Sequence, residues 1–454
     1  MAGKEGAELQ YLERYYEKAG SQLVILYGQK NIGMREMLHT FCQEKPCCFY
    51  AARPCSEREQ LFLWGNELRE DGASLPQYPE YSEVFQALTD DRSEKKVIVI
   101  DEFQNMVKQS REFMPQLIRF MKNEWSSQEV MILLCSTSTG WVENSMVSRI
   151  GTAVYEISGF VKMKEYSFYD MCRFFAGKTK KECIELYAVL GGFPGLWKHF
   201  EPELSVKENI CRHILNRDSF LHEEALRLVA EELRETGVYH AILAALAAGR
   251  EKLNELYRHT GFSRAKISVY LKNLMELEIV EKVFSYDTAG RENTQKGIYR
   301  IKNRFVLFYF RYLYPHLSRL AWMTPQDFYE AYIVPDFRAF SEDAFRQACT
   351  EALEYKNANE ELPFVYTRFG EWVGKVGNID VVAEDEAGHA LVALCNWEKP
   401  QMSYEDYEWL LFCAGKAKLS PDCICLFSAG GFEESLEKEA ERNESLQLMD
   451  INAI

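Results

Sequence analysis

The sequence predicts a multidomain α/β fold with a parallel sheet in its N-terminal part. Short apolar segments alternate with helical patterns through the first 160 residues, and glycine or acidic residues follow the ends of some of these segments. Apolar strands separated by helices are typical of a parallel sheet covered on both faces. A chain of 454 residues is also too long for one ordinary hydrophobic core, so we expect further domains.

The composition narrows the classes of function. Hydrophobic residues make up 47% of the chain and charged residues 27%, which is typical of a soluble globular protein. We find neither an apolar run near the roughly 20 residues of a membrane span nor an apolar secretion signal, so we expect a cytoplasmic protein without a membrane partner. The net charge of -16 opposes general attraction to nucleic acid. The 13 cysteines form no C-x-x-C pair, which argues against a zinc ribbon.

Four apolar segments are predicted to be the strands of this sheet. They are residues 22–28, "QLVILYG", residues 47–52, "CCFYAA", residues 96–103, "KVIVIDEF", and residues 130–138, "VMILLCSTS". Continuous apolar runs of this length indicate strands that are buried on both faces. A charged helical segment precedes the first strand, and we place the end of this domain, residues 1–160, after the last one.

The loop after the first strand has the spacing of a phosphate-binding loop. Gly28 and Gly33 keep the pattern G-x-x-x-x-G-K-[ST], whereas Met34 and Arg35 occupy the positions of Lys and Ser/Thr. Such a loop aims backbone N–H groups at phosphate oxygens, while the Lys contacts the β and γ phosphates and the Ser/Thr binds Mg²⁺. The predicted nucleotide-binding residues are Gly28, Gln29, Lys30, Asn31, Ile32, Gly33, Met34 and Arg35.

Two acidic residues at the end of the third apolar segment support a P-loop NTPase fold. In this arrangement Asp101 binds Mg²⁺ through water and Glu102 orients the attacking water, so both are candidate catalytic residues. The expected ligands are ATP or ADP, with Mg²⁺ at Asp101 if nucleotide binds. Because Met34 carries no charge and Arg35 has no hydroxyl oxygen, we expect little or no hydrolysis. The alternative is that Lys30 or Arg35 replaces the missing Lys.

Helical patterns continue after the predicted sheet and are followed by patterns that mix helices and strands. Residues 161–236 contain helical segments and the turn "GGFPG", which predict a helical lid. Residues 237–303 have the pattern of three helices and a hairpin with the polar turn "DTAGRENTQKG", the outline of a winged helix. A helical connector at residues 304–335 and a mixed α/β domain at residues 336–454 complete the chain.

The predicted winged helix is the part of the chain that could contact DNA. Residues 239–303 hold 11 Lys and Arg against 7 Asp and Glu, a local charge of +4. The front half of the predicted recognition helix carries Arg264 and Lys266, and Lys272 follows them. Basic side chains at this end suit contacts with phosphates and the major groove. The alternative is a module that packs against other domains.

Together these segments resemble the archaeal-type P-loop ATPases, which are relatives of the AAA+ and STAND ATPases. The resemblance covers nearly the whole chain and rests on "LYGQKNIGMR", "VIDEFQ", "LLCSTST", "LGGFPGLW" and the winged-helix segment. It implies that Thr137 or Ser138 senses the γ-phosphate. It also implies that the C-terminal domain has the PD-(D/E)xK core of restriction-endonuclease-like nucleases.

The nuclease motif implied by this resemblance is incomplete. Asp380 matches the metal-binding Asp of the core, but Leu394 and Asn396 occupy the Glu and Lys positions. An early helix that usually carries "FE" has Phe345 and Arg346 instead. One acid cannot hold a catalytic metal as two or three can. The resemblance therefore implies a vestigial site at Asp380 and no nuclease activity.

Three hypotheses about function remain. The favoured one is a degenerate ATPase in which nucleotide, bound between the P-loop domain and the lid or winged helix, biases their orientation without turnover. The second is an active ATPase that uses Lys30 or Arg35. The third is a non-enzymatic DNA-binding or scaffold protein that acts through the winged helix or with a protein partner and binds no nucleotide.

Overall fold

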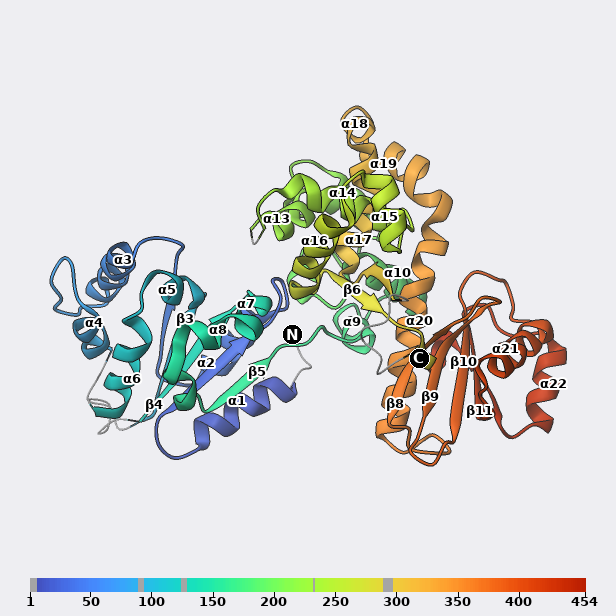
Figure 1. Cartoon of the computed structure of the whole chain (residues 1–454), viewed down its shortest axis with the longest axis horizontal. Coiled ribbons are helices and arrows are strands. Elements are labelled where there is room, and N and C mark those ends of the chain that lie inside the picture. Colours follow the sequence, from blue (N-terminus) through green and yellow to red (C-terminus); the bar gives the residue numbers. More distant parts are fainter. Residues whose placement is uncertain (1–5, 89–93, 124–128, 232, 289–296) are drawn as a thin grey trace. The chain divides into compact units, whose positions relative to one another are not determined.

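The chain divides into two compact units. The computed structural model describes residues 6–88, 94–123, 129–231, 233–288 and 297–454 (Figure 1). The first unit comprises residues 1–165 together with the short segment 193–195, and the second comprises residues 166–192 and 196–454.

The first unit is built on a parallel sheet, as the sequence predicts, but the sheet has five strands: the four predicted ones and a fifth, Gly159–Lys162, which the sequence did not predict. Its strand order is β2-β3-β4-β1-β5. All residues of β3 and β4 are buried, because these apolar strands lie inside the sheet and are covered on both faces. The strands are β1 Gln22–Tyr27, β2 Cys47–Ala51, β3 Lys96–Asp101, β4 Val130–Ser136 and β5 Gly159–Lys162.

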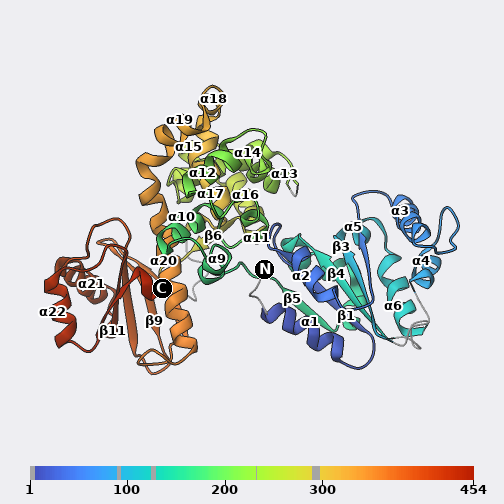
Figure 2. The ribbon, with the colours of Figure 1, turned by 180° about the vertical axis from the view of Figure 1, so that it is seen from behind.

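Helices cover this sheet on both faces. Helix α1, Ala7–Glu17, contacts β1, β5 and α2. Apolar side chains of α3, α4, α5, α6 and α8 pack against the sheet in the core of the unit (Figures 1 and 2). These helices and the remaining two are α2 Met34–Cys42, α3 Glu57–Glu70, α4 Tyr81–Ala87, α5 Gln104–Gln109, α6 Phe113–Asn123, α7 Thr139–Asn144 and α8 Met146–Ile150.

The strand order brings three predicted site segments to one edge of the sheet. Strand β4 lies between β1 and β3, and all three run parallel. Tyr27 at the end of β1 is level with Ser136 at the end of β4. Carboxyl ends of parallel strands meet at the same edge, where ligands bind in open α/β sheets. The loop after β1, Asp101 at the end of β3 and Thr137 after β4 are therefore neighbours.

The second unit begins with helices and contains the winged helix. The predicted helices before it are found as α9 Phe168–Phe174, α10 Lys180–Leu190, α11 Pro194–Trp197, α12 Val206–Ile210 with a π-helical turn Cys211–Leu215, and α13 Glu224–Ala230. The winged helix comprises α14 Thr236–Ala247, α15 Leu253–Thr260, α16 Arg264–Glu276, β6 Val280–Val283 and β7 Ile298–Ile301. Strands β6 and β7 pair antiparallel. Most of the predicted polar turn between them, residues 289–296, lies outside the described residues.

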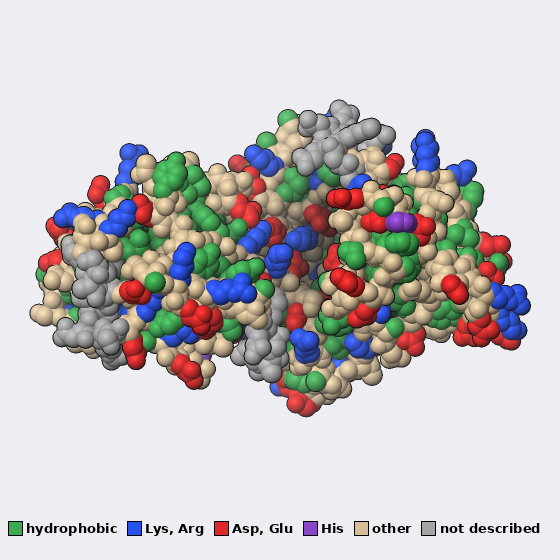
Figure 3. Space-filling view, turned by 90° about the horizontal axis from the view of Figure 1, so that it is seen from below, with side chains coloured by type: hydrophobic (Ala, Val, Ile, Leu, Met, Phe, Trp, Pro, Cys, Tyr) green, Lys and Arg blue, Asp and Glu red, His purple; other side chains and the backbone are tan. Residues whose placement is uncertain are grey.

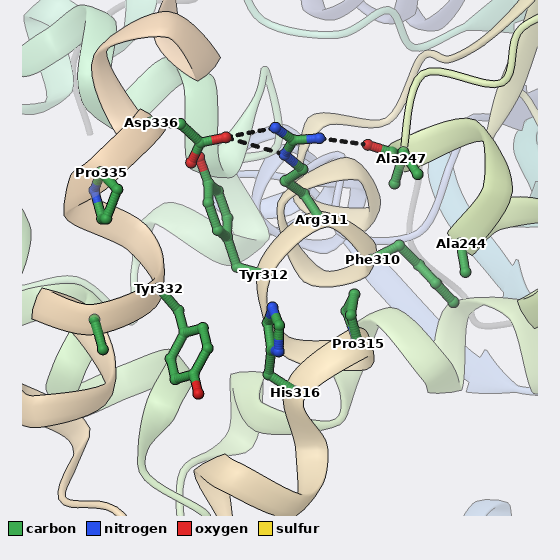
Figure 4. A pocket seen from close by; sticks show the side chains of 12 residues that line it. Ala244, Ala247, Phe310, Arg311, Tyr312, Pro315, His316, Tyr332, Pro335 and Asp336 are labelled. Carbon is green, nitrogen blue, oxygen red and sulfur yellow. Dashed lines mark hydrogen bonds and ion pairs between the residues drawn. The ribbon is translucent and has the colours of Figure 1, made fainter.

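The predicted helical connector is divided into several short helical segments. These are α17 Arg304–Phe308, a π-helical turn Tyr309–Leu313, a short 3₁₀ turn, α18 Leu317–Leu320, α19 Pro325–Phe328 and a second π-helical turn, Tyr329–Ile333. Pro315 has no N–H group to continue a regular helix. The two π-helical turns and α14 line an open pocket of about 350 Å³, shown in Figure 4. On its wall, Arg311 pairs with Asp336 and donates to the Ala247 carbonyl at 3.2 Å.

The C-terminal domain is a separate mixed sheet with helices on both faces. Its order is β12-β11-β10-β9-β8. The pairs β8–β9 and β9–β10 are antiparallel, and the pairs β10–β11 and β11–β12 are parallel. The long helix α20 lies on one face, and α21 and α22 lie on the other (Figures 1 and 2). The elements are α20 Val334–Ala358, β8 Arg368–Val373, β9 Asn378–Glu384, β10 Ala390–Asn396, α21 Tyr404–Ala417, β11 Pro421–Ser428, α22 Glu434–Arg442 and β12 Leu446–Asp450.

Candidate functional site

The loop between β1 and α2 has the backbone path of a phosphate-binding loop. The Gly28 amide donates to the Ser136 carbonyl at 3.2 Å, which ties the start of the loop to the end of β4. Asn31 and Gly33 adopt left-handed φ angles of 65° and 89°, and α2 begins at the next residue, Met34. Turns of this kind, followed by a helix N-terminus, form an anion-binding site from backbone N–H groups.

Two glycines fit this loop tightly against its surroundings. A Cβ atom on Gly28 would lie 2.9 Å from the Cβ of Met163. A Cβ atom on Gly195 would lie 2.8 Å from the Cα of Asn31, and the Gly195 amide donates to the Asn31 carbonyl at 2.9 Å. The "GGFPG" segment, which the sequence predicts only as a turn, thus holds the loop at its strained residue. This contact was missed by sequence reasoning, because residues 31 and 195 are far apart in the chain.

Arg35 forms an ion pair with Asp101. Its Nε and Nη2 atoms lie 3.2 and 3.1 Å from Asp101 Oδ2. The other carboxylate oxygen, Oδ1, accepts a hydrogen bond from the Glu102 amide at 3.1 Å. The Asp101 side chain is 3% exposed and that of Arg35 is 72% exposed. A residue at the predicted phosphate loop therefore neutralises the predicted metal ligand from the solvent side.

Burial and charge act in opposite directions on Asp101. Burial, followed by the negative charge of Glu102, raises the pKa of the Asp101 carboxyl above its ordinary value. The charge of Arg35 and its hydrogen bond lower that pKa and so oppose the shift. Arg35 is thus the countercharge that favours the ionised form of Asp101.

The residues at this edge do not fit Mg²⁺ as a P-loop site requires. Mg²⁺ is bound through oxygen atoms, from the loop Ser/Thr and the strand-end Asp. Position 35 offers a guanidinium and no oxygen, and both Asp101 oxygens accept hydrogen bonds from the protein. Met34, at the position of the phosphate-binding Lys, is apolar and buried. A metal ion at Asp101 would have to share this carboxylate with the Arg35 guanidinium, whose positive charge opposes a cation there.

Glu102 is engaged by neighbouring side chains. The Thr137 hydroxyl donates to Glu102 Oε1 at 2.6 Å, and the Thr137 amide donates to Oε2 at 3.3 Å. Gln104 Nε2 also donates to Oε2, a partner that sequence reasoning missed although the "IDEFQ" segment contains it. Glu102 itself has a left-handed φ of 54°. Thr137 and Glu102, predicted as γ-phosphate sensor and water-positioning residue, therefore contact each other.

Ser138, the other predicted γ-phosphate sensor, is buried at the start of α7. Its amide donates to the Ser136 hydroxyl at 3.1 Å, and its carbonyl accepts from the Val142 amide. The described structure thus places all the predicted loop, acid and sensor residues at one edge of the sheet of the first unit. Within that edge, the acids Asp101 and Glu102 are bound by protein groups.

The predicted DNA-contacting residues lie on α16, whose N-cap Ser263 accepts a hydrogen bond from the Lys266 amide. Arg264 donates to Asn254 at 2.7 Å and stacks on the ring of Tyr257. Lys266 lies 3.6 Å from Glu235, and Lys272 lies 3.7 Å from Glu276. Over the described residues seen in Figure 3, basic and acidic side chains are interspersed.

Asp380, the predicted vestigial nuclease residue, lies on β9 beside an arginine. Its Oδ2 accepts a hydrogen bond from the Cys395 amide at 2.8 Å, and Arg346 Nη1 lies 3.7 Å from Oδ1. Burial raises the pKa of Asp380, and the charge of Arg346 opposes that shift. Arg346, on α20, also pairs with Asp343. Here too an arginine stands next to the aspartate that would bind metal.

Metal-binding clusters and membrane-spanning helices are both absent from the described residues. No three His, Cys, Asp or Glu side chains among them are grouped so as to hold a metal ion. Within the same residues, no helix is both long enough and apolar enough to cross a membrane.

Comparisons with known proteins match two segments and the overall chain. Residues 309–408 match DUF234, archaeal and bacterial proteins of unknown function, and residues 241–282 match the bacterial regulatory proteins of the arsR family. An uncharacterized protein of Methanocaldococcus jannaschii is 24% identical over 402 residues, which cover 86% of each chain.

Solved structures of archaeal proteins are also similar to the chain. The Walker-type ATPase of Pyrococcus abyssi has a TM-score of 0.49 and 17% identity, covering 68% of this chain and 95% of that one. The ORC2 protein of Aeropyrum pernix, in ADPNP and ADP complexes, has a TM-score of 0.45 and 12% identity, covering 70% and 93%. With its parallel sheet, glycine loop and strand-end acids, the chain has a P-loop NTPase fold followed by a winged helix and a separate mixed-sheet domain, and it resembles the archaeal-type P-loop ATPases.

Proposed function

We propose that the first unit binds the phosphates of ATP or ADP without Mg²⁺ and without hydrolysis, so that the chain is a nucleotide-biased switch. The observation that carries this proposal is the ion pair between Arg35 and Asp101. A guanidinium supplies positive charge next to the loop and, unlike an ammonium, grips phosphate oxygens through two N–H groups. Arg35 would therefore supply the charge that Mg²⁺ gives in other P-loop sites.

The loop backbone supports phosphate binding. The left-handed residues Asn31 and Gly33 lead directly into the N-terminus of α2, a helix of nine residues. The partial positive charge of this helix end and the exposed guanidinium of Arg35 both favour an anion. Nucleotide binding needs no more than these groups, so the loss of the loop Lys weakens binding without abolishing it.

The contacts of Glu102 support the absence of hydrolysis. A carboxylate that accepts hydrogen bonds from Thr137 and Gln104 has fewer acceptor sites left for water. Hydrolysis at such a site also depends on a metal ion that bridges the β and γ phosphates. With Asp101 paired to Arg35, the alternative of an active ATPase that uses Arg35 in place of Lys is less well supported.

A switch requires that the loop be linked to the rest of the chain. Asn31 contacts Gly195, and residues 193–195 lead along the chain into the second unit. A ligand that changes the loop at Asn31 would change the energy of the segment at Gly195. We propose that a P-loop domain, residues 1–160, is followed by a helical lid, residues 161–236, which contains this segment. The winged helix at 237–303, the connector at 304–335 and the vestigial nuclease-like domain at 336–454 would follow.

Thermal unfolding with millimolar ATP or ADP tests this function. Ligands that bind only the folded state raise the melting temperature, so we expect a rise with either nucleotide. The rise should be smaller in Arg35→Ala and unchanged in Arg149→Ala, an exposed arginine in α8 of the same unit. A wild-type protein whose melting temperature does not respond to nucleotide would refute the proposal. Steady ATP turnover that is lost in Asp101→Asn would instead favour the active ATPase.

DNA binding through the winged helix is a second candidate function. It is favoured by the match of residues 241–282 to the arsR regulatory proteins and by exposed residues on α16. To bind DNA, Arg264 and Lys266 would have to leave their intramolecular partners and contact phosphates. We expect Arg264→Ala to weaken retention on duplex DNA at low salt, whereas Arg319→Ala in α18 should leave it unchanged. Equal loss in both variants would indicate nonspecific charge.

A further inference from the structure

Helix α21 carries an exposed apolar face. Its inner face, formed by Tyr407, Leu410, Cys413 and Ala414, is buried in the core of the C-terminal domain. On its outer face, the side chains of Trp409 and Phe412 are 45% and 46% exposed. Their rings stack with centroids 5.5 Å apart, as residues three apart on a helix allow. Exposed apolar side chains that cluster on one face are candidates for a contact surface.

The neighbouring turn fixes the position of Trp409. A Cβ atom on Gly377 would lie 2.8 Å from Trp409 Cζ2. The absence of a side chain at Gly377 therefore lets the indole pack against the turn between β8 and β9. Val376 in the same turn and Leu411 in the helix are also exposed and widen the apolar surface. Trp409 is thus held rigidly, which lowers the entropy cost of using it as a contact residue.

Charged residues flank this apolar centre in a self-complementary order. The outer face reads Glu405, Glu408, Trp409, Phe412, Gly415 and Lys416, with spacings of three and four residues that form one helical stripe. The acids lie toward the N-terminal end and the lysine toward the C-terminal end. A surface whose charges reverse sign about its midpoint is complementary to its own copy after a two-fold rotation.

We propose that α21 is the contact between two copies of this chain, packed antiparallel about a two-fold axis at Phe412. In that arrangement Phe412 meets its own copy and Glu408 lies opposite Lys416 of the second copy. Trp409 lies opposite Gly415, around whose missing Cβ no atom lies within 4 Å. Gly415 therefore leaves room for an indole.

A parallel pair of the same helices is disfavoured by charge. It would place Glu408 opposite Glu408 and Lys416 opposite Lys416, and like charges directly opposite each other repel. In the antiparallel pair, each Glu408 instead lies opposite a Lys416, so both contacts are attractive. This inference depends only on the C-terminal domain and is independent of nucleotide binding by the first unit.

Sedimentation of the full-length protein over a wide range of concentration tests the proposal. We expect a reversible monomer–dimer equilibrium that Phe412→Glu shifts to monomer. Tyr155→Glu, at an aromatic residue that is 84% exposed in the first unit, is the matched control and should leave the equilibrium unchanged. At a concentration well below the dimer Kd, where both proteins are monomeric, circular dichroism should show the same melting temperature for wild type and Phe412→Glu, since the side chain lies outside the core. Monomer at every concentration, or a dimer that Phe412→Glu leaves intact, would overturn the proposal.

Charge exchange at the ends of the stripe tests the antiparallel geometry. Glu408→Lys alone and Lys416→Glu alone should each raise the dimer Kd about tenfold, because each replaces two attractive pairs by two repulsive ones. The two single variants mixed together should form a heterodimer near wild-type affinity, since every pair is then of opposite charge. The double variant should dimerise like wild type. A mixture that dimerises no better than the single variants alone would contradict the antiparallel pairing.

Discussion

At the scale of residues, an arginine stands next to the aspartate at each of the two predicted metal sites. Arg35 pairs with Asp101 in the first unit, and Arg346 lies beside Asp380 in the C-terminal domain. In each case the aspartate is mostly buried, and burial raises its pKa. An arginine that is always protonated compensates this burial without a metal ion.

Replacement of Arg35 should change the pH dependence of stability. The folded pKa of Asp101 is raised, so the stability lost through this group grows as pH rises above its ordinary unfolded value of about 4. Arg35→Met removes the opposing charge and should make stability fall more between about pH 4 and pH 7 than in wild type. Because Arg35 is 72% exposed, solvent screens the pair and the extra loss should stay below about 1 kcal/mol. Urea unfolding at a series of pH values measures this difference.

The control for this experiment is Asp101→Asn, which removes the titrating group. The added pH dependence should disappear when Asp101→Asn is combined with Arg35→Met. If Arg35→Met and wild type lose stability in parallel over this pH range, Arg35 does not act as the countercharge of Asp101.

Removal of Arg346 should cost more than removal of Arg35. Burial would raise the pKa of Asp343, but the charges of Arg304 and Arg346 outweigh it and hold that pKa well below its ordinary value. Arg346→Met leaves Asp343 with one cationic partner fewer and Asp380 without its nearby arginine. Because the Asp343 side chain is 50% exposed, solvent screens its ion pairs, and we expect a loss of about 1 kcal/mol in the free energy of unfolding at neutral pH.

A double-mutant cycle checks the role of Arg346. In an Asp380→Asn background, Arg346→Met should cost clearly less, because one of the two carboxylates is already neutral. Equal costs in both backgrounds would show that Arg346 does not act on the charge of Asp380.

The sequence predicts which residues lie at the phosphate loop, but it does not predict which of them form ion pairs with each other. The spacing of Gly28 and Gly33 identified the loop, and the apolar strand before Asp101 identified the acid. The contact between Arg35 and Asp101 joins residues 66 positions apart. It depends on β3 being separated from β1 by a single strand, β4. Only the strand order supplies that information, so the sequence left Arg35 as a candidate substitute for Lys.

At the scale of elements, apolar patterning predicts central strands better than edge strands. Strands β3 and β4 are continuous apolar runs and were predicted. Strand β8, "RFGEWV", was not predicted, because it is an edge strand with alternating polar residues and a register shift near Gly370. The π-helical turns of the connector also escaped prediction, since their aromatic residues suit a regular helix equally well.

The contact between the loop and the "GGFPG" segment can be tested with one methyl group. Gly195→Ala would place a Cβ atom 2.8 Å from the Asn31 backbone, so the loop or the segment must move. We expect Gly195→Ala to reduce the rise in melting temperature that ATP causes. Gly177→Ala is the matched control, since a Cβ atom there meets nothing within 4 Å. An unchanged response to ATP in Gly195→Ala would show that the loop does not depend on this segment.

At the scale of the whole molecule, the order of modules follows from the sequence. The parallel sheet, the helices after it, the winged helix and the mixed-sheet domain appear in the predicted order, and the turn "GGFPG" lies among these helices, after α10. What the sequence did not predict is that residues 193–195 belong to the first unit although the helices around them belong to the second. The chain thus returns to its nucleotide loop after leaving it, which is the physical basis for the proposed switch.

The central claim is that Arg35 takes the place of Mg²⁺ at the phosphate loop. A variant with Met34→Lys and Arg35→Thr restores the side chains of a complete loop and serves as the control, so its ATP affinity should be higher with Mg²⁺ than with EDTA.

The measurement that tests this claim most directly is the calorimetric Kd of ATP for the wild-type protein in Mg²⁺ and in EDTA. Because ATP in Mg²⁺ buffer is largely complexed with the metal, a site that uses Arg35 in place of Mg²⁺ should bind ATP at least as tightly in EDTA as in Mg²⁺. Binding that occurs only with Mg²⁺ would contradict this claim.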